Sequence, residues 1–260
     1  MVNLLNLKPI HCRIIYASNC SLIINNKKER FFVDKGGVVF LRKYTNVIIK
    51  INKHDDRYPP YDFVEFKSQD VDNLLKIMAP MYSPHKRITG NTIDKDNGIL
   101  LINNNGISLS LFSEMKKPMN DRLKAYMIAY FLSESNEVEN IYLSLVRSAT
   151  VHFRDKVKQL IENDIAMKWQ LSLIAEEFNV SEITIRKKLE MEKTSFYQIL
   201  LDVRMQTAAR LILKNEHQIN KVATMVGISS PSYFIRVFHS YYGMTPKNFY
   251  FYYKGRRGKI

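Results

Sequence analysis

An apolar pattern that occurs twice, 48 residues apart, constrains the fold of this chain more than any other feature of its sequence. In each copy the apolar residues stand at positions i, i+3, i+4 and i+7, which form one face of an α-helix. The two copies are Leu171, Ile174, Ala175 and Phe178, and then Ile219, Val222, Ala223 and Val226. The small alanine at the third site lets a second helix cross closely. Each copy therefore predicts a helix that buries one face against a neighbour.

Turn and capping residues follow both predicted helices. Asn179 and Gly227, which tolerate a left-handed backbone, stand where each helix should end. Serine then stands at the N-cap of a predicted second helix, as Ser181 in the first copy and as Ser229-Ser230 in the second, where Pro231 suits the first helical position. A helix, a turn of three to four residues and a second helix make up the helix-turn-helix plan, whose second helix enters the major groove of DNA.

Each predicted second helix presents an outward face once its apolar residues are removed. Arg186 and Arg236 suit a bidentate grip on guanine, and Ile183 suits contact with a thymine methyl group. The hydroxyl groups on both faces suit phosphate oxygens or base edges. The candidate DNA-contacting residues are Ser181, Glu182, Ile183, Thr184, Arg186 and Lys187 in the first copy, and Ser229, Ser230, Ser232, Tyr233, Arg236 and Ser240 in the second. A solvated basic face is the alternative, but two matched copies that carry Ile183 and Tyr233 favour DNA reading.

A single long helix is predicted between the two copies. Ser195 and Gln198 stand at the positions of a capping box, and the helical pattern continues to about Asn215. About 21 residues at about 1.5 Å each give a rod of about 32 Å, close to the roughly 34 Å of one turn of DNA. Such a rod would hold the two second helices near successive major grooves, so that one chain reads one asymmetric site.

The first half of the chain has a different sequence pattern, in which short runs rich in Ile, Val and Phe are separated by turn residues. These runs predict strands over residues 13–24, 30–33, 38–41, 47–51, 63–66, 99–102 and 107–112, with one helix at 70–78. This part is expected to form a small antiparallel barrel or sandwich. From Asn120 the pattern becomes helical, and Leu123, Tyr126, Met127, Tyr130 and Phe131 form an apolar stripe. The stripe suits packing within its own domain or pairing with its twin in a homodimer.

Residues 227–249 resemble the signature of the AraC/XylS family of transcription regulators, and the likeness extends from Val151 to about Tyr253. Within that family, residues 169–171 and 180–190 resemble the enteric virulence activators. The resemblance implies an α+β two-domain fold, with an N-terminal cupin-like antiparallel β-barrel and a C-terminal all-α domain whose two helix-turn-helix units are joined by a long helix. It also implies activation of virulence promoters through recruitment of RNA polymerase, and relief of silencing by nucleoid proteins.

The predicted domain bounds follow from these features. Residues 1–135 are expected to form the cupin-like regulatory and dimerisation domain, 136–150 a linker and helix, 151–253 the DNA-binding domain, and 254–260 a basic tail. The two helix-turn-helix units are placed at about 171–190 and about 219–242.

The resemblance also implies a small anionic effector, because some relatives hold a fatty-acid carboxylate between their domains and others sense bicarbonate. His11, and Lys214 at the end of the long helix, each fall within a residue of a position that a relative uses, and Arg13 and Lys67 are further basic candidates. Glu65 stands where a relative has an arginine, and a carboxylate there would repel an anion unless Arg13 or Lys67 compensates. Control by no ligand at all is the remaining alternative.

Composition narrows the function classes further. The net charge of +14 suits double-stranded DNA as a partner, although the Lys-rich composition alone decides little. No run reaches the ~18 apolar residues of a membrane helix and the N-terminus lacks an export signal, so we expect a cytoplasmic protein without a membrane partner. The six histidines have no metal-ligand spacing, and Cys12 and Cys20 match neither a zinc site nor a redox pair. We therefore predict no metal, no cofactor and no enzymatic activity. A DNA-bound enzyme and an architectural or anti-silencing protein without ligand control are the alternatives.

Overall fold

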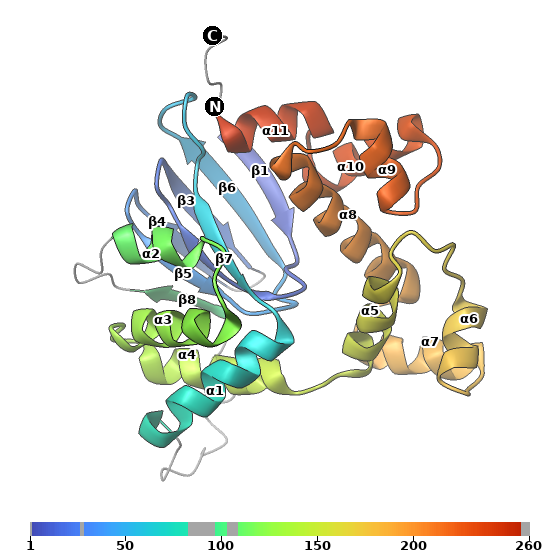
Figure 1. The fold of residues 1–260 in the computed structure, drawn as a ribbon, viewed down its shortest axis with the longest axis horizontal. Coiled ribbons are helices and arrows are strands. Elements are labelled where there is room, and N and C mark those ends of the chain that lie inside the picture. The colour runs from blue at the N-terminus through green and yellow to red at the C-terminus, as the bar shows by residue number, and fades with distance from the viewer. Residues whose placement is uncertain (1, 27–28, 83–96, 103–108, 256–260) are drawn as a thin grey trace. The chain divides into compact units, whose positions relative to one another are not determined.

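The computed structural model describes residues 2–26, 29–82, 97–102 and 109–255, which divide between two compact units, Met1–Thr150 and Val151–Gly255 (Figure 1). The described part of the first unit contains the strands β1 (Val2–Leu7), β2 (Cys12–Tyr16), β3 (Cys20–Asn25), β4 (Arg30–Val33), β5 (Val38–Leu41), β6 (Val47–Lys53), β7 (Asp62–Phe66) and β8 (Ile99–Ile102). Its helices are α1 (Ser68–Tyr82), α2 (Leu109–Met115), α3 (Asp121–Ser133) and α4 (Val138–Ala149).

The strands of the first unit form two four-stranded antiparallel sheets, in the orders β1-β6-β3-β4 and β7-β2-β5-β8. Alternate residues of β6 are buried, so the first sheet has one covered face. All four residues of β5 are buried, so the second sheet is covered on both faces. Its Ile14, Phe40 and Phe66 share a buried core with Leu74 of α1 and Phe131 of α3. The second sheet is therefore a middle layer, with helices on one face.

The cupin-like barrel expected from the resemblance is not confirmed, because the described strands pair into two separate sheets rather than one closed sheet. A strand paired on both sides with both faces covered, as β5 is, belongs to a layered structure, and this favours the sandwich alternative.

Local composition misled the prediction at two further places. The run 13–24, predicted as one strand, contains β2 and β3 with a turn between them, and β1 was not predicted. The strand predicted over 107–112 is wrong for its described residues, because these begin helix α2. Phe112 and Met115 lie one helical turn apart, both are buried, and the Phe112 ring packs 5.9 Å from that of Phe131. Tertiary packing thus overrides the β-rich composition.

The apolar stripe predicted on α3 has two environments. Phe131 is buried in the helix-facing core and Met127 packs against that core. Leu123, Tyr126 and Tyr130 remain exposed, at 48%, 49% and 58% of their full surface. Two residues of the stripe therefore pack within their own unit, and the other three lie on the surface of that unit.

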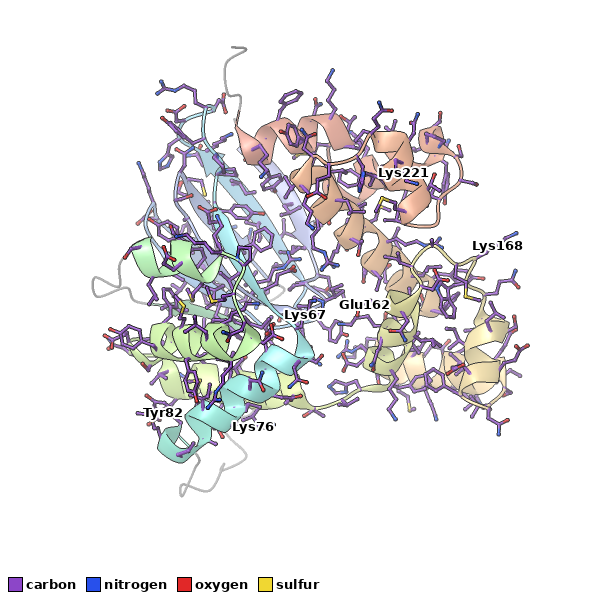
Figure 2. All side chains as sticks on the ribbon, viewed as in Figure 1. Lys67, Lys76, Tyr82, Glu162, Lys168 and Lys221 are labelled. Carbon is purple, nitrogen blue, oxygen red and sulfur yellow. The ribbon has the colours of Figure 1, made fainter. Side chains whose placement is uncertain are left out.

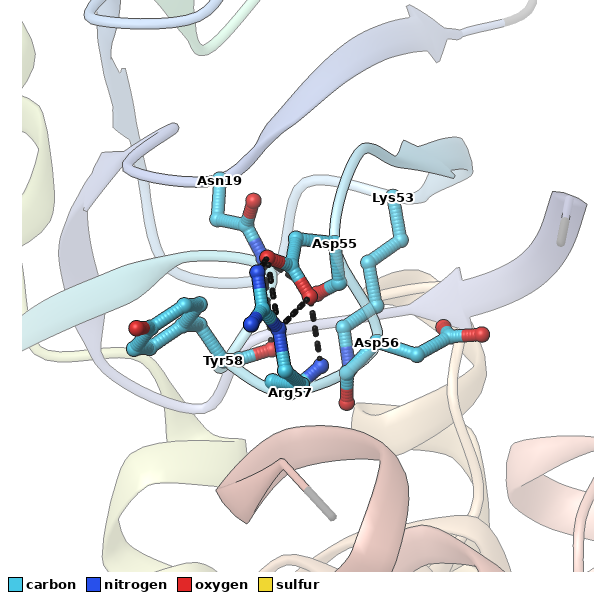
Figure 3. Close-up of polar contacts among 6 residues, drawn as sticks. All are labelled: Asn19, Lys53, Asp55, Asp56, Arg57 and Tyr58. Atoms are coloured by element: carbon cyan, nitrogen blue, oxygen red, sulfur yellow. Dashed lines mark hydrogen bonds and ion pairs between the residues drawn. The ribbon is translucent and has the colours of Figure 1, made fainter. Parts of the chain in front are cut away.

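Asn19 organises the loop that follows β6 (Figure 3). Its side-chain amide donates hydrogen bonds to the carbonyl oxygens of Asp55 and Tyr58, at 2.7 and 3.3 Å. The guanidinium of Arg57 binds the Asp55 carboxylate and lowers the pKa of that group to about 2. Lys53 Nζ donates to the carbonyl oxygen of Asp56 at 3.3 Å. This connection between β6 and β7 is therefore ordered by its own side chains.

The second unit consists of helices, namely α5 (Phe153–Asn163), α6 (Leu171–Glu177), α7 (Glu182–Met191), α8 (Phe196–Lys214), α9 (Ile219–Met225), α10 (Pro231–Tyr242) and α11 (Pro246–Lys254). The small and branched residues that repeat in the sequence are buried here, including Ile174, Ala175, Val222 and Ala223. Helix α6 packs on α7 and α9 packs on α10, and α8 connects the two pairs. Among the described residues, no helix combines the length and the apolar character needed to cross a membrane.

Candidate DNA interface

Helix α7 begins at the N-cap predicted from the sequence. The Ser181 hydroxyl accepts a hydrogen bond from the Thr184 backbone N–H at 3.2 Å and lies 2.9 Å from the Thr184 hydroxyl. Ile185 and Leu189 are buried and fix the helix on its unit, whereas Ile183 is 62% exposed. The two hydroxyl groups therefore serve the start of the helix, and the apolar Ile183 faces solvent.

Arg186 and Glu182 form an ion pair on the exposed face of α7. Arg186 Nη2 lies 2.8 Å from Glu182 Oε2, one helical turn away; the Arg186 side chain is exposed and that of Glu182 is partly exposed. An exposed pair at this spacing contributes only about 0.3–0.5 kcal/mol. Glu182 therefore holds the guanidinium of Arg186 only weakly. Lys187 is exposed beside this pair.

Helix α10 presents the corresponding face of the second helix-turn-helix unit. The Ser230 hydroxyl caps it by accepting from the Tyr233 backbone N–H at 3.3 Å. Tyr233 is 50% exposed, and the Arg236 guanidinium lies 5.5 Å from the centre of its ring. Ser229, Ser232 and Ser240 are also exposed. A flat ring and a cation are thus presented together on the exposed surface of α10.

Contacts with α11 and α8 hold α10 in place, and the sequence did not reveal the hydrogen bond to α8. Phe234 and Phe238 are fully buried, and Phe238 packs edge-on against Phe249 of α11. Tyr241 donates its hydroxyl hydrogen to Asp202 Oδ1 on α8 at 2.9 Å, and Gln198 donates to the same oxygen at 2.8 Å. Tyr241 and Asp202 are 39 residues apart, so no local signal could have predicted this bond.

Two lysines beside the first helix of each unit were also missed (Figure 2). Lys168 lies three residues before Leu171, the first residue of α6, Lys221 lies on α9, and both are exposed. In helix-turn-helix proteins the first helix crosses the DNA backbone, where lysine binds phosphate without reading sequence. The signal available in the sequence was a lysine in or just before each predicted first helix.

The effector candidates of the first unit form one patch on the second sheet. Strand register pairs Arg13 with Glu65 and Cys12 with Phe66, so His11 and Lys67 lie next to the Arg13–Glu65 pair. Arg13 Nε donates to Glu65 Oε1 at 2.7 Å, and the Arg13 guanidinium also lies 5.2 Å from the centre of the Phe63 ring. The Glu65 carboxylate is therefore neutralised by Arg13, which removes the repulsion expected from an uncompensated carboxylate.

The surroundings of these candidates differ. His11 is buried, at 7% exposure, while the Lys67 side chain is exposed just before α1 (Figure 2). The Lys67 backbone N–H donates to the Asp70 carboxylate at 2.8 Å, which fixes the chain at the start of α1. In the second unit, Lys214 is an exposed residue in the last turn of α8, where the chain ends the helix with Asn215 in a left-handed conformation.

Comparison with known proteins agrees with the helical architecture. Residues 174–250 match a family model described as a helix-turn-helix domain. The chain is 36% identical over 241 residues to the virulence regulon transcriptional activator VirF of Shigella flexneri, covering 93% of this chain and 92% of VirF. It is also 36% identical over 244 residues to the DNA-binding dual transcriptional regulator Rns of Escherichia coli, covering 93% of this chain and 91% of Rns. This chain belongs to the AraC/XylS family.

The family likeness predicted from the sequence is thus confirmed, including the likeness to enteric virulence activators. A crystal structure of apo ToxT from Vibrio cholerae has a TM-score of 0.70 to this AraC/XylS protein at 20% identity, covering 98% of this chain and 97% of ToxT. A second ToxT structure, with a bound unsaturated fatty acid, has a TM-score of 0.65 and covers 100% and 97% of the two chains. At this identity the comparison establishes a shared two-domain fold.

Two observations concern the possible metal ligands and the thiols of the described residues. In the described ranges, no three His, Cys, Asp or Glu side chains gather closely enough to hold a metal ion. Burial raises the pKa of the Cys12 thiol, and it raises that of Cys20 to about 12. Both thiols therefore stay protonated near neutral pH and are poor nucleophiles.

Proposed function

We propose that this AraC/XylS protein activates virulence genes by reading one asymmetric DNA site with α7 and α10, and by recruiting RNA polymerase to the promoter. The observation that carries the proposal is the presence of two capped second helices, each with an exposed arginine and an exposed large residue, Ile183 or Tyr233. Relatives whose names give virulence or transcription activation as their role support it.

The connecting helix supports a single site that spans two groove segments. Helix α8 has 19 residues, which corresponds to about 28 Å at 1.5 Å per residue. One turn of DNA is about 34 Å, so helices attached near the two ends of α8 suit neighbouring major-groove segments on one face of the duplex.

Selection of bound sequences from a random DNA library, followed by footprinting of the full chain, tests this proposal. We expect an asymmetric consensus and two protected segments about one helical turn apart. Exposed phosphate-binding candidates outside the second helices, such as Lys168 and Lys221, should leave the consensus unchanged when replaced by alanine. Protection of a single segment by one chain would contradict the two-groove arrangement.

The alternative function is that of an architectural DNA-binding protein. Binding of the chain to the selected duplexes and to random duplexes distinguishes the two functions. A protein that coats DNA without reading it binds selected and random duplexes with nearly equal affinity, whereas a specific regulator prefers its site by about 10³-fold or more. The exposed Ile183 favours the regulator, because an apolar side chain gains nothing from phosphate.

A small anionic effector is the second part of the proposal. A fatty acid or bicarbonate would bind near His11, Arg13 and Lys67 of the first unit, and Lys214 is a separate candidate in the second unit. The fatty acid in the ToxT structure supports a carboxylate ligand. Pairing of Arg13 with Glu65 removes the repulsion that an uncompensated carboxylate would exert on an anion, and Lys67 is the exposed cation beside the pair.

Self-association through α3 is the third part. Leu123, Tyr126 and Tyr130 form an exposed stripe on one face of this helix, and the guanidinium of Arg122 lies 6.0 Å from the centre of the Tyr126 ring. Aromatic residues and arginine are enriched in protein interfaces, and a second copy of the same helix would cover the stripe symmetrically.

A further inference from the structure

The two helix-turn-helix units differ at the turn that follows their first helix. Asn179 in the first unit and Gly227 in the second occupy equivalent places and both adopt a left-handed backbone, with φ of 50° and 74°. Asparagine tolerates this conformation, as Asn179 and Asn215 show in this chain. Backbone conformation alone therefore does not explain why the second turn carries glycine.

Close packing explains the glycine. A Cβ atom at Gly227 would lie 2.5 Å from Arg204 Nη2 and 2.9 Å from the carbonyl oxygens of Ala166 and Ile165. The arginine tip can move, but the two carbonyl groups belong to backbone that precedes the first helix-turn-helix unit. The turn of the second unit thus lies directly against the segment that leads into the first unit.

Arg204 ties the same place to the connecting helix. It lies on α8, and its Nη2 donates to the Met167 carbonyl oxygen at 2.9 Å. That carbonyl also accepts from the Trp169 backbone N–H at 2.9 Å, and the Trp169 indole donates to the Asp164 carbonyl oxygen at 2.7 Å. The segment between α5 and α6 is therefore ordered by its own hydrogen bonds, and Arg204 binds this ordered segment.

Three parts of the second unit consequently meet at one junction, which we define as Arg204, Gly227 and the backbone of residues 165–167. We propose that Arg204 and Gly227 are positioning residues that fix the orientation of α10 relative to α7, and thereby set the spacing between the two DNA segments that the chain reads. The inference rests on the proposed two-segment DNA reading and adds the residues that determine its geometry.

Spacing is a sensitive readout of this junction because DNA is a helix. With about 10–10.5 base pairs per turn, each inserted base pair rotates the second segment by roughly 35° and moves it by about 3.4 Å. A rigid pair of reading helices loses contacts when that happens, whereas a pair that pivots about α8 keeps them. A role in folding alone would change stability without changing this preference.

The substitutions are chosen to separate the effect of the junction on spacing preference from its effect on the stability of the fold. Arg204→Met removes the hydrogen bond to Met167 but keeps the unbranched stem of the side chain, and it also removes a buried Nε for which no described residue provides a hydrogen-bond partner. Gly227→Asn adds the Cβ while keeping a residue that accepts the left-handed backbone. Asn179→Gly is the matched control, since it alters the equivalent turn of the first unit.

The experiment measures the affinity of the full chain for a duplex that the wild type selects from a random library, and for derivatives with one or two base pairs inserted between the protected segments. We expect the wild type and Asn179→Gly to lose roughly tenfold or more per inserted base pair, comparable to a mismatched base pair. Arg204→Met and Gly227→Asn should bind the parent and spaced duplexes within about threefold of each other. Arg204→Lys, which retains a donor for the Met167 carbonyl, should keep most of the wild-type preference.

The outcomes separate this inference from the function on which it rests. If the wild type protects two segments while the folded Arg204→Met chain keeps the wild-type spacing preference, the junction does not set the spacing. If the wild type protects only one segment, the two-segment function and the junction both fail. Thermal unfolding of each variant identifies a chain that is merely unstable, and should Gly227→Asn not fold, Arg204→Met decides alone.

Discussion

At the scale of single residues, the two arginines that we propose read DNA are held loosely, and the serines that cap their helices are held firmly. The Arg186–Glu182 pair is exposed, so its contribution of at most about 0.5 kcal/mol is smaller than the roughly 1–3 kcal/mol that a bidentate contact with guanine provides. Base recognition can therefore displace Glu182 at small cost. Ser181 and Ser230, in contrast, are bound to the backbone that they cap and keep the helix starts in place.

Alanine at either arginine should separate base reading from phosphate binding. Arg186→Ala and Arg236→Ala should each weaken binding to the selected duplex by roughly 1–3 kcal/mol while changing affinity for random DNA much less. Arg57→Ala is the matched control, because Arg57 is an exposed arginine that pairs with Asp55 in a loop of the first unit. Fluorescence titration of both duplexes measures the effect. Equal losses on selected and random DNA for Arg236→Ala would show that this side chain contacts phosphate only.

At the scale of elements, the sequence predicted those parts of the fold whose signals are local. Helices α7, α8 and α10 begin after Ser181, Ser195 and Ser230 as predicted, because an N-cap and a 3.6-residue apolar period lie within a few residues of each other. The turns at Asn179 and Gly227 were predicted for the same reason.

Elements that depend on distant partners were not predictable in this way. Helix α2 is set by packing on α3 rather than by its own composition, and the Tyr241–Asp202 bond joins residues 39 apart. The contact of Arg204 with Met167 joins residues 37 apart. Because the close neighbours of Gly227 are also distant in the sequence, the sequence explained this glycine only by the turn that it forms. The strand pattern left a barrel and a sandwich as alternatives and the resemblance added a cupin-like barrel, but neither specifies how the strands pair.

The exposed stripe of α3 leads to a prediction at the same scale. Tyr126→Lys and Tyr130→Lys should each weaken self-association of the full chain by about tenfold or more, since removing a central aromatic residue from an interface commonly costs over 1 kcal/mol. Tyr58→Lys is the control, because Tyr58 is 58% exposed in the loop after β6. Sedimentation velocity over a range of concentrations measures the effect. Association that is unaffected by both α3 substitutions would place the interface elsewhere.

At the scale of the whole molecule, effector control requires that the anion favour one state of the chain over another. A ligand that binds both states equally shifts no equilibrium, however tightly it binds. A coupling of about 1–3 kcal/mol changes DNA affinity by roughly 5–150-fold, which is the range that a useful switch needs. The charges available for such a ligand are the patch beside the Arg13–Glu65 pair and the exposed Lys214.

Lysine substitutions in the full chain should show which of these charges the effector uses. Without ligand, Lys67→Ala and Lys214→Ala should bind DNA as the wild type does, because neither residue lies on α7 or α10. In a DNA titration with decanoate or with bicarbonate, the DNA affinity of the wild type should change by roughly 5–150-fold. A variant that lacks an effector contact should lose that change in affinity. Lys50→Ala is the matched control, since Lys50 is exposed in β6 outside the patch. A full response in both the Lys67→Ala and Lys214→Ala chains would remove these residues from the effector site. A wild type that responds to neither anion would leave a transcription regulator whose activity is set by its DNA affinity and its concentration alone.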